Sequence, residues 1–231
     1  MSTTRGADEL EFFARIRSAL AGGSGVVAAR PIAPAIEESL VRKLADAPRA
    51  TLVARFEERA LQNGMRFART SRASLAVALA AVLRATTSAH RVTTSTGKSA
   101  VAGEIAAALE SAACAVVDWR ASPGLEAHFE VEVGVTEVFS AIAETGTLVV
   151  ASSASSSRGA WLVPPVHVAI VLASQVVPDL IDGLRQLAAL RVQPSAVVFI
   201  TGPSKTADIE GILVTGVHGP HSVQVLLVED A

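Results

Sequence analysis

The chain has 231 residues, half of them hydrophobic, a formal net charge of −2 and a pI near 6.2. That length and apolar content suit one large α/β domain, or one domain with a smaller appendage. The nearly balanced charge provides no general attraction to nucleic-acid phosphates or anionic lipids, so we expect no nucleic-acid partner. The single cysteine, Cys114, excludes a disulfide within the chain, a four-thiolate iron–sulfur cluster and a cysteine-rich zinc site.

The N-terminus and the longest uncharged run bear on where the protein works. Residues 1–6 are polar and precede acidic residues, which is not the charged-then-apolar order of a secretory signal. Residues 159–178 carry no charge but include Pro164, Pro165 and His167. A buried strand with flanking loops explains this run better than a membrane span. We therefore expect a cytoplasmic protein with no membrane span.

Residues 1–70 are predicted to form a helical extension with a linker. Residues 8–20 place apolar side chains at helical spacing, and the glycine-rich stretch 22–25 ends that pattern. Residues 36–62 again have a helical pattern, which Pro48 breaks in two. Such a segment packs either on a sheet domain or on a partner, and the sequence leaves both alternatives open.

From residue 71 the chain alternates helical patterns with short β-type runs, which predicts a layered α/β domain over residues 71–231. Helices are expected at 71–88, 98–112 and 178–190. Strands are expected at 91–94, 115–119, 138–143, 147–151, 166–172, 196–201 and 223–228. The turn between the third and fourth of these strands contains Gly146, which accepts the positive φ of a tight hairpin.

The sequence Thr96-Gly97-Lys98-Ser99, at the start of a predicted helix, resembles the end of a nucleotide-binding P-loop. The spacing is wrong for that motif, because Val92 stands where its first glycine belongs. This argues against a nucleotide triphosphatase. Gly97 and Lys98 remain candidates for holding a carboxylate or phosphate at a helix N-terminus. The alternative is that Thr96 only caps the helix.

Two polar segments follow in the chain. Glu144 and Thr145 lie on the predicted hairpin, where a carboxylate could act as a base or accept a hydrogen bond from a ligand hydroxyl. An ordinary polar turn is the alternative. The serine-rich stretch 152–157 has the composition of a mobile loop, and Arg158 after it could bind an anion through two parallel hydrogen bonds.

Two histidines are candidates for different roles. His167 starts an apolar strand, where a histidine titrates near neutrality, binds a ligand or, more commonly, is a structural residue. His218 lies between Gly216 and Gly219, which permit a ligand to approach the backbone, so it is the better candidate for proton transfer. With Asp208 and Glu210 these histidines could make a metal site, but their spacing matches no metal motif, so the sequence leaves a metal open and we predict none.

The segment 201–210 combines glycine, proline, hydroxyl groups and both charges between two β-type runs. We expect it to form a short helix near a strand end, which is where ligands bind on α/β scaffolds. Its candidate ligand-binding residues are Gly202, Ser204, Lys205 and Asp208, with Gly219 following. Asp208 could also be a solvated charge at the start of that helix.

Four motifs occur in an order that resembles the LUD-domain family, particularly its lactate utilisation protein C branch. They are Ala143-Glu144-Thr145-Gly146-Thr147, Pro164-Pro165-Val166-His167, Thr201-Gly202-Pro203-Ser204-Lys205-Thr206-Ala207-Asp208-Ile209-Glu210 and Gly216-Val217-His218-Gly219-Pro220. The similarity covers roughly the C-terminal two thirds of the chain. Lys205 departs from the family pattern, in which arginine is more usual, and it keeps the charge but loses the planar fork.

The resemblance implies a three-layer, Rossmann-like α/β fold similar to that of the sugar-phosphate isomerase and CoA-transferase superfamily. It also implies a bacterial role in oxidising L-lactate to pyruvate beside two iron–sulfur partner proteins. The iron–sulfur clusters are then expected only in those partners, and no cofactor is predicted in this chain. The motif positions carried over are Glu144, Thr145, Gly146, His167, Gly202, Ser204, Lys205, Asp208, His218 and Gly219.

The favoured hypothesis is a non-redox subunit or accessory factor of lactate oxidation that binds a small carboxylate, a phosphorylated ligand or a partner. Lys98, Arg158 and Lys205 would contact the anion, and Glu144 and His218 would transfer protons. The alternative is a stand-alone enzyme of the isomerase or CoA-transferase type that uses Glu144. A purely structural scaffold is a third hypothesis, and the sequence leaves a homodimer open.

Overall fold

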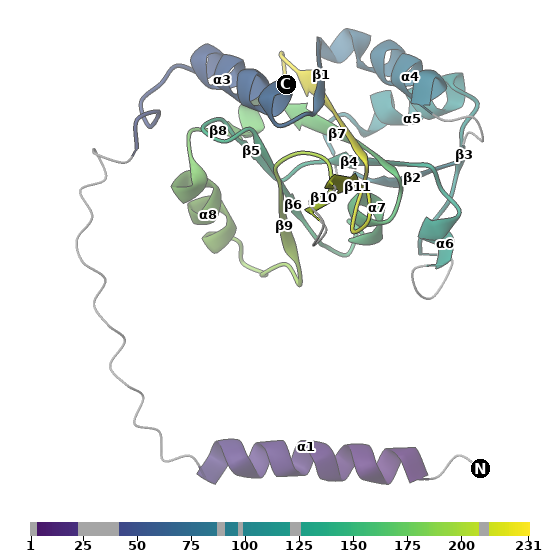
Figure 1. Ribbon diagram of the computed structural model, residues 1–231, viewed down its shortest axis with the longest axis vertical. Helices are drawn as coiled ribbons and strands as arrows, with labels where there is room; N and C mark the ends of the chain where they lie inside the picture. Colours follow the sequence, from purple (N-terminus) through teal and green to yellow (C-terminus); the bar gives the residue numbers. More distant parts are fainter. Residues whose placement is uncertain (1–3, 23–41, 87–90, 97–98, 121–125, 208–212) are drawn as a thin grey trace. The chain divides into compact units, whose positions relative to one another are not determined.

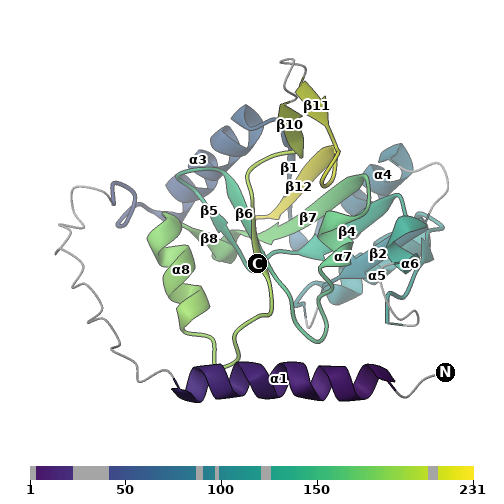
Figure 2. The same ribbon diagram turned by 60° about the horizontal axis from the view of Figure 1, so that its bottom comes forward.

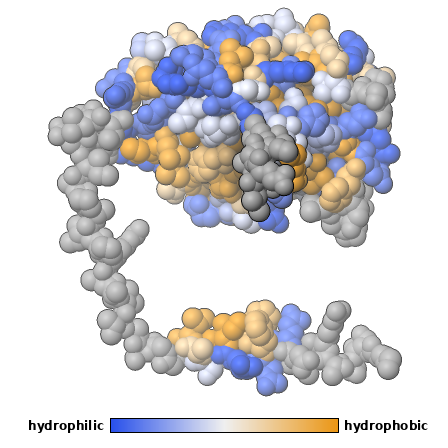
Figure 3. Space-filling view, viewed as in Figure 1, coloured by the Kyte–Doolittle hydropathy of each residue, from blue (hydrophilic) through white to orange (hydrophobic). Residues whose placement is uncertain are grey.

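A computed structural model describes residues 4–22, 42–86, 91–96, 99–120, 126–207 and 213–231. Its contacts divide the chain into two units, residues 1–38 and residues 39–231. The first unit contains the predicted N-terminal helix, α1 (Thr4–Gly22). Apolar side chains lie along one side of α1 and charged side chains along the other (Figure 3). None of the described helices is long and apolar enough to cross a membrane.

The second unit contains the other helices and strands (Figure 1). Its first half comprises α3 (Arg49–Gln62), β1 (Arg66–Thr70), η1 (Arg72–Ser74), α4 (Leu75–Thr86), β2 (Arg91–Ser95), α5 (Ala102–Ser111), β3 (Ala115–Val116), α6 (Glu126–Phe129), β4 (Val133–Glu137), β5 (Ser140–Ile142) and β6 (Thr147–Ala151). Its second half comprises α7 (Gly159–Leu162), β7 (Val166–Leu172), η2 (Ala173–Gln175), β8 (Val176–Val177), α8 (Leu180–Ala188), β9 (Val197–Ile200), β10 (Lys205–Ala207), β11 (Leu213–Thr215) and β12 (Ser222–Val228).

Six strands form a parallel sheet in the order β1-β12-β7-β4-β2-β3. The central strand β7 is buried along its whole length, as expected for a parallel strand that is covered on both faces. Because side chains alternate along a strand, Val168 and Ile170 face α4 and α5. These two helices contribute Leu79, Leu83 and Ile105 to that layer of the core.

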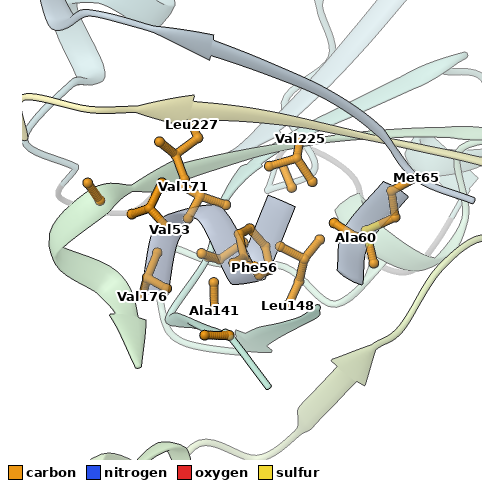
Figure 4. Close-up of a cluster of buried hydrophobic side chains, with 14 of the residues drawn as sticks. Val53, Phe56, Ala60, Met65, Ala141, Leu148, Val171, Val176, Val225 and Leu227 are labelled. Carbon is orange, nitrogen blue, oxygen red and sulfur yellow. The ribbon is translucent and has the colours of Figure 1, made fainter. Parts of the chain in front are cut away.

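The opposite face of this sheet is covered by α3 and by a second sheet with the strand order β8-β5-β6-β9 (Figure 2). Phe56 of α3 is fully buried between the two sheets, against Leu148 of β6 and strand residues such as Val171 and Val225 (Figure 4). The outer face of the second sheet packs against α8 through Leu187. The core therefore has three layers: one between the parallel sheet and helices α4 and α5, one between the two sheets, and one beneath α8.

The fold confirms the predicted α/β class, with a six-stranded parallel sheet between helices. Strand β7 matches its predicted bounds, and α3 begins directly after Pro48. Strands β1 and β4 were missed. The expected helix at 201–210 is wrong in its described part, because β10 pairs antiparallel with β11. The predicted strand at 115–119 is reduced to β3, since only its first two residues pair with β2.

The predicted domain division at residue 70 stays a prediction. The structure places α3 and β1, which belong to the predicted extension, within the second unit. Strand β1 forms the edge of the parallel sheet through its pairing with β12, and α3 contributes to the core between the sheets. The burial of α3 follows from its sequence, because Leu52, Val53, Phe56 and Ala60 recur at helical spacing.

Candidate functional site

Two neighbouring strands of the parallel sheet send the chain in opposite directions at their carboxyl ends. Strand β2 ends at Ser95 and is followed by α5, on one face of the sheet. Strand β4 ends at Glu137 and leads to β5 in the second sheet, on the other face. Such a divergence is a topological switch point, and open α/β sheets bind ligands in the crevice beside it.

A pocket of about 350 Å³, which we call the edge pocket, lies at this switch point. Ser95 and Thr96 line it from the end of β2, and Glu137 lines it from the end of β4. The remaining lining residues are Val138, Phe139, Ala151, Ser152, Ser153, Ser155, Ser156, Leu190, Val192 and Pro194. The edge pocket thus combines hydroxyl groups and one carboxylate with an apolar wall, as ligand sites usually do.

Glu137 is held by Gln175 at one of its two carboxylate oxygens. Gln175 Nε2 donates to Glu137 Oε1 over 3.0 Å and to the Val138 carbonyl oxygen over 2.9 Å. The backbone N–H of Leu172 donates to Gln175 Oε1 over 2.8 Å, which fixes the orientation of the amide. The other oxygen, Glu137 Oε2, is buried and has no hydrogen-bond partner among the described residues.

A second pocket, of about 620 Å³, adjoins the edge pocket through Ser152, Ser153 and Ser156, which line both. We call it the arginine pocket because Arg120 and Arg158 line it. The Arg120 guanidinium lies over the Trp119 ring, 4.3 Å from the ring centroid. The other lining residues are Trp119, Ala154, Ser157, Gly159 and Ser195. Guanidinium and hydroxyl donors in one hollow suit a carboxylate or phosphate group.

A chain of hydrogen bonds joins the two pockets beneath α7. The Ser95 hydroxyl donates to Ser156 Oγ over 3.0 Å, and the Ser157 backbone N–H donates to Ser95 Oγ over 2.7 Å. Ser157 Oγ lies 3.0 Å from His128 Nε2 and accepts from the Gly159 N–H over 3.1 Å. His128 is buried, and burial lowers its pKa. A neutral imidazole there can accept a hydrogen bond from the Ser157 hydroxyl and hold the serine loop in place.

The hairpin residues Glu144, Thr145 and Gly146 lie elsewhere, against the end of α3. The Thr145 carbonyl oxygen accepts from Asn63 Nδ2 over 2.8 Å. A Cβ on Gly146 would lie 2.5 Å from the backbone nitrogen of Ala60, and Gly146 has a φ of +68°. Glu144 is exposed, and its backbone N–H donates to the Pro178 carbonyl. The described contacts of this turn are therefore those of a structural corner.

The structure brings together four of the predicted site residues, Gly202, Ser204, His218 and Gly219. They line a pocket of about 300 Å³ with Trp161 and other residues, here called the amino-edge pocket. The other lining residues are Leu162, Val198, Phe199, Ile200, Thr201, Pro203, Pro220 and Val223.

This pocket lies at the amino ends of β7 and β12, because the His221 N–H donates to the Pro165 carbonyl just before both strands begin. The 201–210 block directly follows the end of β9, so it lies near a strand end as expected, and its role in ligand binding stays a prediction. Strand β9 belongs to the second sheet, so its end does not have to lie at the carboxyl edge of the parallel sheet.

Lys205 and His167 have different surroundings from these groups. Lys205 is exposed on β10, and its Nζ would lie 3.9 Å from a Cβ built on Gly64. His167 is fully buried, with Nε2 2.8 Å from Thr136 Oγ1, and its Nδ1 has no partner among the described residues. Burial lowers the pKa of His167 to about 4, so the imidazole is neutral near pH 7. This supports a structural histidine.

Three predicted site residues, Gly97, Lys98 and Asp208, lie outside the described residues. Thr96, which directly precedes Gly97, lines the edge pocket. Arg158, predicted as an anion contact, lines the arginine pocket and forms no ion pair with another described residue. In the described part of the chain, no group of three or more His, Cys, Asp and Glu side chains is placed to hold a metal ion.

The sequence model of the LUD-domain family matches residues 53–228. This range includes both pockets at the carboxyl edge and the amino-edge pocket. The chain belongs to the LUD-domain family. Proteins named Lactate utilization protein C are similar to it: that of Bacillus subtilis strain 168 is 42% identical over 122 residues, and that of Bacillus licheniformis is 37% identical over 122 residues. Each alignment covers 50% of this chain and 51% of the relative, so the chain matches about half the length of these relatives.

A solved structure shares the layered architecture of this chain. A DUF162 family protein from Deinococcus radiodurans, known from a crystal structure, superposes with a TM-score of 0.59 and 26% identity. The superposition covers 78% of this chain and 98% of the other. The layered α/β architecture is thus shared with this relative over most of the LUD-domain chain.

Sequence reasoning missed Ser95, His128 and Glu137 as site residues of the LUD domain. Glu137 is the last residue of β4 (Val133–Glu137). This strand was not recognised because its glycine and threonine interrupt the apolar pattern. Its position at the end of a short β-type run before the predicted strand at 138–143 was the available signal. His128 had no signal in the sequence, because its contact with Ser157 spans 29 positions.

Proposed function

We propose that this LUD-domain protein is a non-redox subunit or accessory factor of L-lactate oxidation to pyruvate, and that it binds a small carboxylate at the carboxyl edge of its sheet. The observation that carries the proposal is the joined pair of pockets at the β2/β4 switch point, which contains guanidinium and hydroxyl donors. The similarity to proteins named Lactate utilization protein C supports the metabolic setting.

Arg158 is the group best suited to the carboxylate of the ligand. Its guanidinium forms no ion pair with the other described residues, so a ligand anion does not have to displace an internal carboxylate. A guanidinium binds a carboxylate through two parallel hydrogen bonds, and the serine hydroxyls can supply further donors. Lys98, two residues beyond Thr96 in the chain, is proposed as a second cation for the same ligand.

The redox centres of the system are proposed to lie in iron–sulfur partner proteins. A chain with one cysteine cannot provide the four thiolates of an ordinary cluster. Cys114 is a poor candidate for redox chemistry, since partial burial raises its pKa and favours the unreactive thiol. We also propose a cytoplasmic location and a fold related to the sugar-phosphate isomerase and CoA-transferase superfamily, in line with the family resemblance.

Ligand binding tests this proposal directly. We expect L-lactate or pyruvate to bind the purified chain in titration calorimetry, and the fluorescence of Trp119 to change on binding because this residue lines the arginine pocket. Arg158→Ala should weaken binding by about tenfold or more. The matched control, Arg55→Ala, removes a half-buried arginine of α3 that pairs with Glu58 away from both pockets, and it should bind like the wild type. Absence of binding by both acids would refute the proposed ligand class.

A redox assay tests the assignment as a subunit without clusters. The isolated chain should show no lactate-dependent reduction of a dye, and activity should appear when the iron–sulfur partners are added. Lactate-dependent dye reduction by the chain alone, with no bound flavin or metal, would contradict the proposal.

The isomerase-type or transferase-type alternative depends on Glu144 as the reacting carboxylate. The exposed position of Glu144 on the turn beside α3 provides no enclosed site for that chemistry. A thermal-shift screen with sugar phosphates and CoA esters separates the alternatives, because stabilisation that is lost in Glu144→Gln would favour the enzyme.

A further inference from the structure

We propose that strand β9 is an interaction surface for a second copy of this chain, and that two copies pair their β9 strands antiparallel into one continuous sheet. Strand β9 is the outer strand of the second sheet, next to β6 (Figure 1). The pairing does not depend on the ligand proposed above, so it goes beyond the proposed function. The backbone groups of β9 that face away from β6 carry the proposal.

The register of β6 and β9 shows which backbone groups these are. Val149 lies opposite Phe199, and Val150 lies opposite Val198, in an antiparallel pair. The Val149 carbonyl oxygen accepts from the Phe139 N–H over 2.8 Å, on the side of β5, so it points away from β9. Because bonded and non-bonded pairs alternate between antiparallel strands, Val150 and Val198 are a bonded pair and Val149 and Phe199 are not. The N–H and C=O of Phe199 therefore point away from β6.

Val197 presents its backbone in the same direction. The Ser152 N–H donates to the Ala196 carbonyl oxygen over 2.9 Å, so Ala196 faces β6 and the next residue, Val197, faces outward. No described residue forms a backbone hydrogen bond with the outward groups of Val197 or Phe199. Such a row of unpaired donors and acceptors is a template for pairing with another chain.

The other edges of the two sheets are protected, and β9 is not. In the parallel sheet, the edge strand β1 carries Arg66 and Arg69, and the edge strand β3 has two residues. At the opposite edge of the second sheet, the Arg49 guanidinium donates to the Val176 carbonyl oxygen of β8. Residues 192–204, which contain β9, carry no charge, and β9 itself has no proline. Charged side chains and proline are the usual means of blocking an edge.

Apolar surface accompanies these backbone groups. Phe199 of β9 is 39% exposed and Leu162 of α7 is 48% exposed, and both line the amino-edge pocket. Val198 and Ile200 line the same pocket and are only partly buried. A strand laid along β9 would cover part of this surface, which adds hydrophobic stabilisation to the backbone hydrogen bonds.

The edge suits a second copy in its backbone register and in its charge. With a two-fold axis at Val198, Val197 of each copy lies opposite Phe199 of the other. Both pairs then join outward-facing residues, and each pair can exchange two N–H···O bonds. A two-fold axis also brings each copy of the segment 192–204 against itself, so a charge there would meet its like, and the segment carries none.

The expected dimer is weak. Strand β9 has four residues, so the contact buries less than a standard interface of about 1,600 Å², and we expect dissociation in the micromolar range. Sedimentation velocity of the full chain should show a monomer that becomes a dimer as the concentration rises through that range. A protein that stays monomeric throughout the range would overturn the proposal.

Amide hydrogen exchange locates the contact without a substitution. The Val197 and Phe199 amides should exchange more slowly as the concentration rises, because the second copy pairs with them. The Val198 amide is the internal control, since it already faces β6 and should be protected at every concentration. A dimer that leaves the exchange of Val197 and Phe199 unchanged would overturn the assigned surface.

Two variants of one residue test the two-fold pairing. Phe199→Lys and Phe199→Glu each place like charges near one another across the axis, so each should raise the dimer dissociation constant by about tenfold or more. Mixing the two variants should restore dimers, which a folding defect would not allow. The matched control Val77→Lys changes a valine of α4 that is 74% exposed, and it should dimerise like the wild type.

The remaining outcomes also decide the matter. Dimers of wild-type strength in Phe199→Lys would place the contact elsewhere and overturn the proposal. Folded single variants that stay monomeric when mixed would overturn the two-fold pairing. Protection of the Val197 and Phe199 amides only after iron–sulfur partner proteins are added would assign the edge to those partners and not to a second copy. None of these results bears on the carboxylate site, which ligand titration tests separately.

Discussion

The side-chain amide of Asn63, just past the carboxyl end of α3, donates to the carbonyl oxygen of Thr145 over 2.8 Å. The contact continues inward through hydroxyl groups: Thr145 Oγ1 lies 2.7 Å from Thr147 Oγ1, which lies 2.8 Å from Thr201 Oγ1. The hairpin motif and the start of the 201–210 segment thus meet at the end of α3. These hydrogen bonds hold the end of α3 against the second sheet.

Removal of the Asn63 amide should therefore lower stability. We expect Asn63→Ala to reduce the free energy of unfolding by about 1 kcal/mol, the usual net value of one hydrogen bond. Urea denaturation followed by circular dichroism measures this change. Gln62→Ala is the matched control, because its hydrogen bonds with described residues are those with the Arg59 and Glu58 side chains of the same helix. An effect of equal size in the control would contradict the assigned role.

Gly202 should not tolerate a side chain. It has a φ of +112°, and a Cβ there would lie 2.5 Å from the carbonyl oxygen of Asn63. We expect Gly202→Ala to lower the free energy of unfolding by about 2 kcal/mol or more, because it combines backbone strain with overpacking. The control Gly103→Ala lies in α5 with no atom near its Cβ, so it should be neutral or stabilise by up to about 1 kcal/mol. Similar stability of both variants in thermal denaturation would contradict this expectation.

The buried imidazole of His167 should make stability depend on pH. Its pKa falls from an ordinary value of 6.5 to about 4, because burial disfavours the charged form. The unfolded chain takes up this proton below pH 6.5 and the folded chain only near pH 4. The contribution of neutral His167 to the free energy of unfolding is therefore fully present above pH 6.5. It is lost as the pH falls toward 4, by about 3 kcal/mol in total.

The variant His167→Gln isolates this contribution from those of the carboxylates and of His128. Glutamine can still bond with Thr136, the partner of the imidazole Nε2, but it does not titrate. Denaturation curves recorded between pH 7 and pH 4 should therefore show a shallower loss of stability in the variant. Parallel pH profiles for the two proteins would contradict the assignment.

Gly159 and His128 should be energetically coupled. A Cβ on Gly159 would lie 2.0 Å from His128 Cδ2, and His128 is buried. We expect Gly159→Ala to cost about 2 kcal/mol, since the imidazole has little room to move. It should also weaken carboxylate binding, because the displaced imidazole shifts Ser157 in the arginine pocket.

A double-mutant cycle measures that coupling. The double variant with His128→Ala removes the clash, so its loss of stability should be smaller than the sum of the losses in the two single variants. Additive losses would show that the two residues do not interact. Circular dichroism during chemical denaturation provides the four free energies of unfolding.

The sequence predicted those features that depend on neighbouring residues. The unbroken apolar run 166–172 indicated a strand covered on both faces, and β7 is buried throughout. Gly146 of the predicted hairpin has the positive φ expected of it, +68°. The four motifs also sufficed to indicate the LUD-domain family, which the match over residues 53–228 confirms.

Tertiary structure decided which residues share a pocket. Ser95 and Glu137 lie far apart in the chain and line one pocket because β2 and β4 are adjacent strands whose carboxyl ends lead to opposite faces of the sheet. Arg158 lines the adjoining pocket. Strand β4 was missed, since Gly134 and Thr136 interrupt its apolar pattern, yet its pairing with β2 and β7 holds it within the sheet. Strand pairing is a long-range interaction that no window of neighbouring residues contains, so the location of the candidate site followed from the fold alone.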